Sequence, residues 1–352
     1  MRLAVLGVGL IGGSLGLAAR QRLGAEVVGW DRDPAVADRA IAKGAIDAGA
    51  ATIEEAVAGT DLVVVAAPVG ALPDAVGAAL AAAPADAVVT DVGSVKHPVV
   101  TAHGADERFI GGHPLAGAEV AGVEHARADL FDDATWYLTP TGASGGMLFE
   151  RLHRFLTSLG ARPQAIDADV HDRVLAAVSH LPHVLANIMV AQTAGALGNE
   201  ETIPSTGPSF RDATRVAGAN PRMWGDIYHA NREALGAQID DAIARLSRVR
   251  AILDTPSELE AWQGAVADER HRLLEAGLVG GATRELRVAV PNKPGVVAEL
   301  ALTLGRAGIN ISDMALSPSP DNRNGVVALW CTSEQAGRAA ELIGDLGYPV
   351  TT

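Results

Sequence analysis

The chain has 352 residues, of which 48% are hydrophobic, so it is long enough to form two or three domains with buried cores. Its formal net charge of −14 repels phosphate, which argues against general binding to nucleic acid or to an anionic membrane. A small anionic substrate would therefore need a locally basic pocket. Cys331 is the single cysteine, so an intrachain disulfide and a cysteine-based metal site are excluded.

Neither a signal peptide nor a membrane span is expected. The chain passes from Met1 directly into an apolar strand, without the charged, apolar and cleavage regions of a signal peptide. The longest apolar stretch, residues 62–85, is interrupted by Asp74 and by prolines, and it is typical of a strand followed by a helix. We therefore expect a cytoplasmic protein.

Residues 1–166 alternate short β-rich runs with alanine-rich helical stretches. The expected strands are residues 2–6, 26–30, 62–66, 87–91, 109–111 and 136–138. Strands separated by helices of this length indicate βαβ units and an α/β domain with a Rossmann-type, doubly wound parallel sheet. Ligands of such sheets bind at the carboxyl ends of the strands, so the residues that follow each strand are the first candidates for a site.

Residues 167–282 lack a strand pattern and are predicted to form an all-α domain. Helices are expected at residues 171–196, 211–217, 221–253 and 257–275. Several of them lack one clean polar face, as helices buried in a bundle or in a subunit interface do. The segment therefore predicts a helical dimerisation domain and a homodimer.

Residues 283–352 predict a third, small α+β domain. Strands are expected at residues 286–290, 310–316 and 325–330, helices at 294–306 and 333–346, and a closing extended run at 348–350. The order is strand, helix, two strands and helix, which is a compact unit with its own sheet.

The first strand leads into the glycine turn Gly7-Val8-Gly9-Leu10-Ile11-Gly12 and then into a helix. The first glycine permits a tight turn, the second lets the backbone approach a pyrophosphate, and the third lets the helix pack on its strand. In this strand–turn–helix context the pattern indicates dinucleotide binding. The predicted cofactor contacts are Gly7, Gly9, Leu10, Ile11, Gly12, Asp31, Arg32 and Ser94.

Asp31 ends the second strand and favours NAD, because its carboxylate accepts hydrogen bonds from ribose hydroxyls and repels a 2′-phosphate. Arg32, together with Arg20 or Arg22, leaves NADP open as the alternative.

Two further segments with chemically active residues follow strands of the first domain, DVGSVK at 91–96 and GGHPLAG at 111–117. Glycines around His113 allow close backbone approach and leave the imidazole facing a cleft. A neutral imidazole there can take a proton from an alcohol during hydride removal. The alternative interpretation is a histidine on an exposed surface loop.

The helical segment carries two pairs of polar residues at helical spacing. His180 and His183 lie three positions apart beside Pro182, which is expected to kink the helix. Arg211 and Arg215 lie four positions apart and suit a bidentate grip on carboxylates, although a solvated helix face is the alternative. Zinc binding by the histidines lacks a third ligand at a clear spacing, so no metal is expected.

Together these segments resemble the prephenate/arogenate dehydrogenase family of tyrosine biosynthesis. The resemblance covers about residues 1–280 and rests on GVGLIGGS (7–14), DVGSVK (91–96), GGHPLAG (111–117), LFDDATWYLTP (130–140), SHLPH (179–183) and FRDATRVAGANPRMWGDI (210–227). The tail RELRVAVPNKPGVVAELALTLGRAGINISDM (284–314) is similar to an ACT domain, an amino-acid-sensing module.

The resemblance implies an NAD-dependent oxidative decarboxylation of prephenate, with arogenate as the alternative substrate and no metal. It implies that His113 assists deprotonation of the ring hydroxyl, that Ser94 contacts this hydroxyl and that Lys96 supports the same region. It places a substrate carboxylate on Arg215. The further residues implied for the pocket are His183, His180, Arg211 and Trp224, the last from the other subunit of a dimer.

For the tail, the resemblance implies effector-binding turns and feedback by L-tyrosine. The implied effector residues are Asn292, Pro294, Gly295 and Asn310. A purely structural role of the tail in assembly is the alternative, because a fold does not determine a function.

The chain departs from the family pattern at Pro208-Ser209, where relatives usually have two glycines. Proline has no backbone N–H, so a main-chain contact to the substrate side chain is in doubt, and with it the choice between prephenate and arogenate. Other dehydrogenases with a helical domain would need a catalytic lysine there, and no lysine occurs between residues 97 and 292. A non-catalytic sensor of dinucleotide and amino acid is the remaining alternative.

Overall fold

The computed structural model describes residues 1–117, 120–197, 207–278, 283–311, 313–319 and 323–351. The chain forms two compact units. The first consists of residues 1–172, 221–230 and 283–352, and the second of residues 173–220 and 231–282. The expected boundary after residue 282 falls at residues 279–282, which lie outside the described part.

The first unit contains an eight-stranded sheet in the order β3-β2-β1-β4-β5-β6-β7-β8. Its strands are β1 (Arg2–Leu6), β2 (Glu26–Trp30), β3 (Ala48–Gly49), β4 (Leu62–Val65), β5 (Val88–Asp91), β6 (Phe109–Pro114), β7 (Thr135–Thr139) and β8 (Arg162–Ala165). The helices that connect them are α1 (Leu10–Leu23), α2 (Pro34–Lys43), α3 (Ile53–Val57), α4 (Leu72–Ala82), α5 (His97–His103) and α6 (Gly146–Ser158). The predicted Rossmann-type architecture is confirmed.

Strand β1 buries side chains on both faces of this sheet, because successive side chains of a strand point in opposite directions. Leu3 and Val5 belong to one apolar cluster, together with residues of α1, α2 and α6. Ala4 and Leu6 belong to a second cluster, together with residues of α3, α4 and α5. Burial on both faces explains why the strands read as continuous apolar runs.

Strand β6 differs from the sequence prediction in its length and in its partner. It was expected to end at Gly111, because glycines weaken a strand pattern. It continues to Pro114, because β7 pairs with it antiparallel, in a register that sets Gly111 against Thr139 and His113 against Tyr137. The other strand pairs of the sheet are parallel. His113 therefore lies inside a strand and not in the loop that follows it.

The tail forms the predicted α+β domain, with a four-stranded antiparallel sheet in the order β10-β11-β9-β12. Its elements are β9 (Thr283–Pro291), α13 (Val296–Arg306), β10 (Asp313–Pro318), β11 (Asn324–Thr332), α14 (Ala336–Asp345) and β12 (Val350–Thr351). The turn before α13 packs closely on the first domain, where the Gly295 amide donates to the Ser144 carbonyl over 2.9 Å. Gly295 has a φ of +83°, and a Cβ there would lie 2.3 Å from the Gly142 carbonyl oxygen.

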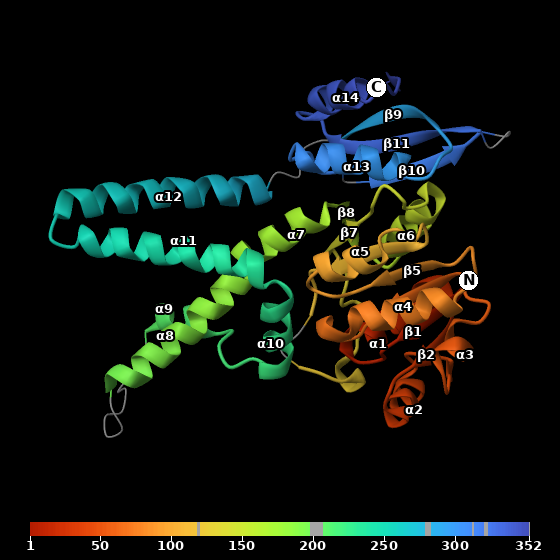
Figure 1. Cartoon of the computed structure of the whole chain (residues 1–352), viewed down its shortest axis with the longest axis horizontal. Helices are drawn as coiled ribbons and strands as arrows, with labels where there is room; N and C mark the ends of the chain where they lie inside the picture. The colour runs from red at the N-terminus through yellow and green to blue at the C-terminus, as the bar shows by residue number, and fades with distance from the viewer. Residues whose placement is uncertain (118–119, 198–206, 279–282, 312, 320–322, 352) are drawn as a thin grey trace. The chain divides into compact units, whose positions relative to one another are not determined.

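The helical segment begins with one long run, residues 168–197 (Figure 1), which passes from the first unit into the second. The run comprises α7 (Ala168–Leu175), a π-helical turn (Ala176–His180) and α8 (Leu181–Leu197), so the helix is interrupted directly before Pro182. A wider turn there is consistent with the missing N–H of proline. The remaining helices are α9 (Pro208–Thr214), α10 (Pro221–Ala230), α11 (Arg232–Ala251) and α12 (Pro256–Leu278).

The helix over residues 168–196 is, within the described ranges, long and apolar enough to cross a membrane, with a mean hydropathy of 1.6 and 28% of its most apolar window buried. The sequence predicted a helix at residues 171–196 and no membrane span. Length and composition do not separate a membrane span from a helix whose apolar face packs against protein.

The contact of Gly295 with the first domain is testable against Gly308, a second tail glycine with a positive φ of +74° and open space around its Cβ position. Gly308→Ala should cost about 1–2 kcal/mol, which is the strain of a left-handed residue. Gly295→Ala should cost roughly a further 1–3 kcal/mol, because the methyl group clashes with backbone that cannot move freely.

Thermal unfolding of the two variants, followed by circular dichroism, measures this difference. Equal destabilisation would show that the turn before α13 does not depend on close packing against Gly142.

Candidate active site

The glycine turn at the carboxyl end of β1 is closely packed on its protein side and open on the other. Gly7 has a φ of +96°, and a Cβ on it would lie 2.4 Å from the Ala66 carbonyl oxygen. A Cβ on Gly12 would lie 2.0 Å from the Gly7 oxygen, whereas a Cβ on Gly9 would meet nothing within 4 Å. The open space at Gly9 lies at the N-terminus of α1, where backbone N–H groups favour an anion. The turn therefore fits a dinucleotide diphosphate.

Asp31 lies directly after β2 and is tied to the glycine turn. One of its carboxylate oxygens accepts from the Val8 amide over 3.1 Å, and the other accepts from the Asp33 amide over 3.1 Å. A carboxylate has about four acceptor positions, so two of them remain for hydroxyl groups of a ribose. Leu10 and Ile11 lie half-buried in the first turn of α1.

The arginines that left NADP open have different surroundings. Arg20 pairs with Asp47 over 2.7 Å, and Arg22 pairs with Asp132 over 2.6 Å. Within the described chain, Arg32 is exposed and forms no ion pair. Of the three, Arg32 alone has an uncommitted guanidinium near Asp31.

Lys96 lies in the loop after β5 and is completely buried. Its ammonium group donates to the Asp91 carboxylate and, over 2.7 Å, to the Gly112 carbonyl. Asp91 also accepts from the amides of Gly93 (2.8 Å) and Gly112 (3.1 Å). Burial lowers the pKa of Lys96, and Asp91 opposes this shift. The pair thus fastens the end of β5 to the backbone of β6, beside His113.

Ser94 lies in the same loop and is half-buried. Its hydroxyl group has no hydrogen-bond partner among the described residues, so it is available to a ligand. The role that the resemblance implies for it stays a prediction.

His113 is 8% exposed and contacts a second histidine that the sequence analysis did not identify. Its Nδ1 lies 2.8 Å from Nε2 of His171, and the two rings meet edge to face. Nδ1 of His171 lies 2.7 Å from Oδ1 of Asp172. Burial lowers the pKa of His171, with Asp172 opposing the shift, so the ring is held neutral near pH 7.

The sequence offered no local signal for this contact. His171 and His113 are 58 positions apart, and His171 appeared only as the start of a helix. The adjacent pair His171-Asp172 is consistent with an oriented histidine ring, because a carboxylate beside a histidine commonly orients it, but the pair does not indicate that His171 contacts His113.

The residues predicted on the helical segment belong to the second unit, with one exception. His180 is buried in the π-helical turn with Nδ1 3.1 Å from Nδ2 of Asn231, and His183 contacts Asn187. Burial lowers the pKa of His183, and a hydrogen bond with the Val216 backbone opposes the shift.

The two arginines of this segment are exposed. Arg211 lies in α9, and Arg215 is the residue at which that helix ends. The exception is Trp224, which lies in α10, within the first unit, with its ring 5.5 Å from that of Tyr228. No group of three or more metal-ligating side chains occurs among the residues that the structure describes.

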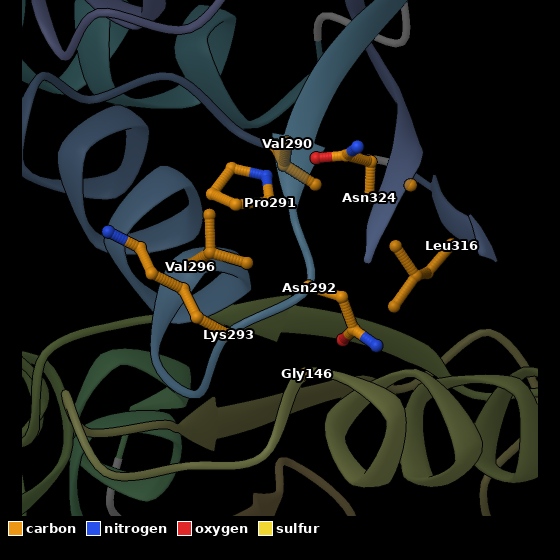
Figure 2. Close-up of a pocket in the computed structure, with 9 residues that line it drawn as sticks. Gly146, Val290, Pro291, Asn292, Lys293, Val296, Leu316 and Asn324 are labelled. Carbon is orange, nitrogen blue, oxygen red and sulfur yellow. The ribbon is translucent and has the colours of Figure 1, made fainter. Parts of the chain in front are cut away.

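The predicted effector residues separate into two places. Asn292 lines a small pocket between the tail and the start of α6, next to Gly146 (Figure 2). Pro294 and Gly295 follow in the same turn, whereas Asn310 is exposed and does not line the pocket. The pocket's volume of about 10 Å³ admits roughly one water molecule, so an amino acid would require it to open.

Comparison with known proteins identifies the three parts of the chain. Residues 15–164 match the nucleotide-binding domain of prephenate dehydrogenase, residues 167–262 its dimerization domain, and residues 284–347 the ACT domain. The chain is 34% identical over 257 residues to a cyclohexadienyl dehydrogenase of Zymomonas mobilis, an alignment that covers 71% of this chain and 88% of that protein. This chain belongs to the prephenate dehydrogenase family.

Two further relatives align with larger shares of this chain. The prephenate dehydrogenase of Bacillus subtilis is 29% identical over 351 residues, which are 95% of this chain and 93% of that protein. A solved prephenate dehydrogenase from Aquifex aeolicus, in complex with hydroxyphenyl propionate and NAD+, has a TM-score of 0.71 and 28% identity, covering 78% of this chain and 98% of that one. The family, the fold and the dehydrogenase class that the sequence predicted are confirmed.

The two sides of the glycine turn predict different effects of adding a methyl group. Gly9→Ala should leave the free energy of unfolding within about 0.5 kcal/mol, because φ at Gly9 is −73° and the space is open. Its NAD affinity should fall by about tenfold or more, because the methyl group takes the place of a phosphate.

Gly12→Ala is the matched variant, and it should lose roughly 1–3 kcal/mol of stability through the clash with Gly7. Calorimetric titration with NAD and denaturant unfolding separate the two effects. Unchanged NAD binding by Gly9→Ala would remove this turn from the cofactor site.

Proposed function

We propose that the chain catalyses the NAD-dependent oxidative decarboxylation of prephenate to 4-hydroxyphenylpyruvate. The observation that carries the proposal is His113, a buried imidazole on β6 in contact with a second histidine that burial keeps neutral. It lies in the domain that carries the glycine turn, so a base for an alcohol and a site for a hydride acceptor are combined in one sheet. Membership of the prephenate dehydrogenase family supports this substrate class.

The cofactor is NAD. The Asp31 carboxylate beside the glycine turn disfavours a 2′-phosphate, and Arg20 and Arg22 are engaged in ion pairs with Asp47 and Asp132. The related Aquifex aeolicus enzyme was solved with NAD+. NAD, when bound, takes up the hydride that leaves C4 of the substrate ring.

The protein's task in this reaction is to position the substrate and to move one proton. His113 takes the proton of the 4-hydroxyl group as C4 loses its hydride and becomes a carbonyl carbon. The ring carboxylate then leaves as carbon dioxide, and its electron pair completes the aromatic ring. The phenol oxygen regains the proton, so the base is restored. Ser94, with a free hydroxyl group, donates to the oxygen on which negative charge develops.

The substrate carboxylates are bound by the helical segment. Arg215 is exposed at the end of α9, and its guanidinium suits bidentate binding of a carboxylate. An acidic protein with net charge −14 needs such a local cation for a dianionic substrate. The resemblance implies further substrate contacts from His183, His180, Arg211 and Trp224, and this proposal includes them.

Arogenate is the second candidate substrate. The residue at the start of α9 supports it. Pro208 is the first residue of that helix, so the N–H that a glycine would offer there is absent. The substrate side chain, pyruvyl or alanyl, is then recognised by other groups. The Zymomonas mobilis relative is named for the cyclohexadienyl ring, which both substrates share.

The chain forms a homodimer through the helical segment. Apolar residues of this segment are strongly exposed in the single chain, among them Val178 and Ile188 of the long run, Leu246 of α11 and Leu273 of α12. Such a surface favours a subunit interface, and the matched family model describes a dimerization domain. The same interface would cover the apolar helix over residues 168–196, and the protein is proposed to be cytoplasmic.

The reaction is tested by NADH formation from prephenate and from arogenate, assayed side by side. We expect turnover of at least one substrate, and we expect His113→Asn to lower kcat by roughly 10²–10⁴ while NAD binding stays unchanged. His125→Asn, which changes an exposed histidine of the same domain, is the matched control and should keep full activity.

Two outcomes contradict the proposal. Absence of NADH from both substrates would favour a non-catalytic sensor of dinucleotide and amino acid. A normal rate of His113→Asn would remove His113 as the base.

L-Tyrosine binds the ACT domain and inhibits the enzyme. The turn with Asn292 faces the start of α6, so a ligand there would contact both domains. At its other end α13 also reaches the first domain, where Arg306 pairs with Asp167 over 3.1 Å. Asp167 accepts from the amides of Asp169 and Val170 and so caps α7, the helix that carries His171. The ACT domain is thereby connected to the surroundings of His113.

Arg306→Gln should weaken tyrosine inhibition several-fold and leave the uninhibited rate unchanged, because it cuts this connection outside the active site. Arg287→Gln, which removes an exposed arginine paired with Glu285 inside the tail, should retain inhibition. Inhibition curves of the two variants make the comparison. A wild-type enzyme that tyrosine does not inhibit would leave the ACT domain with a role in assembly only.

A further inference from the structure

The contact of His113 with His171 belongs to a longer chain of hydrogen bonds that ends on a buried carboxylate. We propose that Asp172 and His171 act as positioning residues that set the tautomer of His113, so that its Nε2 is the proton acceptor. The inference rests on the proposed role of His113 as the base. It assigns functions to two residues that lie on α7, outside the segments that the sequence analysis singled out.

Asp172 is held by backbone donors that fix its orientation. It is 4% exposed, its Oδ1 accepts from the Lys96 amide over 2.8 Å, and its Oδ2 accepts from the His97 amide over 2.8 Å. Backbone amides can only donate. Both oxygens of Asp172 are therefore acceptors.

Because both Asp172 oxygens are acceptors, the donor atom of each histidine in the series can be assigned. Oδ1 of Asp172 lies 2.7 Å from Nδ1 of His171, so Nδ1 of His171 must carry the proton. Burial keeps His171 neutral, and its Nε2 is then an acceptor. Nδ1 of His113, 2.8 Å away, must donate to it. A neutral His113 with its proton on Nδ1 has its lone pair on Nε2, which is the form that a general base requires.

Aromatic packing holds the middle of the chain in place. The ring of Tyr137 meets the His171 ring nearly at right angles, at a centroid distance of 5.6 Å. Tyr137 stands opposite His113 in the register of β6 and β7. The two histidine rings also cross at 75° with their centroids 5.1 Å apart. The His171 ring is thus held between the rings of His113 and Tyr137, and it cannot turn without losing these contacts.

The hydrogen-bonded series Asp172–His171–His113, called the relay below, also places a negative charge on the side of His113 that faces away from Nε2. When His113 takes the substrate proton it becomes positive, and Asp172 stabilises that charge through His171. The other charged groups that face His171 are Lys96 and Asp91, which lie paired with one another. Asp91 forms its ion pair with the Lys96 ammonium, whereas Asp172 contacts Nδ1 of His171 directly, so its charge acts on the histidines at shorter range.

The test is Asp172→Asn in the full-length enzyme, with Asp169→Asn as the matched control. Asparagine has the shape of aspartate, but its NH₂ group cannot accept from a backbone amide or from Nδ1 of His171. Asp169→Asn removes the same charge from the same helix, at an exposed residue that pairs with His97 over 2.5 Å.

We expect Asp172→Asn to lower kcat by roughly 10²–10⁴ with KM and NAD affinity within about twofold of the wild type. The acid limb of the kcat profile should move to lower pH, because loss of the negative charge lowers the pKa of His113. Asp169→Asn should change neither. A fall in kcat with an unmoved acid limb would mean a structural role, and an unchanged kcat would overturn the relay.

Two further measurements keep the inference testable if Asp172→Asn does not fold. His171→Gln retains an acceptor for His113 and should be at least tenfold more active than His171→Leu, whereas equal activity would contradict the relay. In the wild-type enzyme, ¹⁵N resonances of the histidines should show His113 protonated at Nδ1, and a proton on Nε2 would contradict it. If His113→Asn is itself fully active, the proposed function fails first, independently of these results.

Discussion

The buried pair of Lys96 and Asp91 is the interaction on which the site depends. Charges removed from water are stabilised only where hydrogen bonds satisfy them, and here each group is satisfied by the backbone as well as by its partner. Asp91 accepts from two amides, and Lys96 donates to the Gly112 carbonyl. Because Gly112 is bonded through both its N–H and its C=O, the next residue, His113, is held in a fixed place on β6. The sheet that carries the glycine turn thus also holds the proposed base, His113.

The same loop also connects His113 to α7. The Lys96 amide donates to Asp172, which contacts His171 and through it His113. The helix that carries both residues is capped by Asp167, where the ACT domain's Arg306 binds. The proposed regulation by the tail and the proposed proton transfer at His113 would therefore both involve α7. Short polar contacts connect the tail to the surroundings of His113 within one compact unit.

Features set by local pattern could be predicted, and features set by distant contacts could not. The glycine turn and Asp31 follow from a strand, a turn and a helix that adjoin in sequence. The extension of β6 to Pro114 depends on antiparallel pairing with β7. The sequence did not predict it, because Gly111 and Gly112 interrupt the strand pattern. The resemblance assigned Lys96 to the catalytic region, and the structure shows its buried ammonium group paired with Asp91, five positions away. His171 meets His113 across 58 positions, a distance over which periodicity carries no information.

The most direct test of the central claim is Lys96→Met, with the free energy of unfolding and kcat measured on the same sample. Methionine leaves the Asp91 carboxylate buried without its partner, so we expect unfolding to become easier by about 3–5 kcal/mol. We expect kcat to fall with it, because Gly112 and His113 lose their anchor. Lys43→Met, at an exposed lysine that donates to the Glu124 carbonyl, should change neither. A large loss of kcat with unchanged stability would contradict the claim and make Lys96 a group that acts on the substrate.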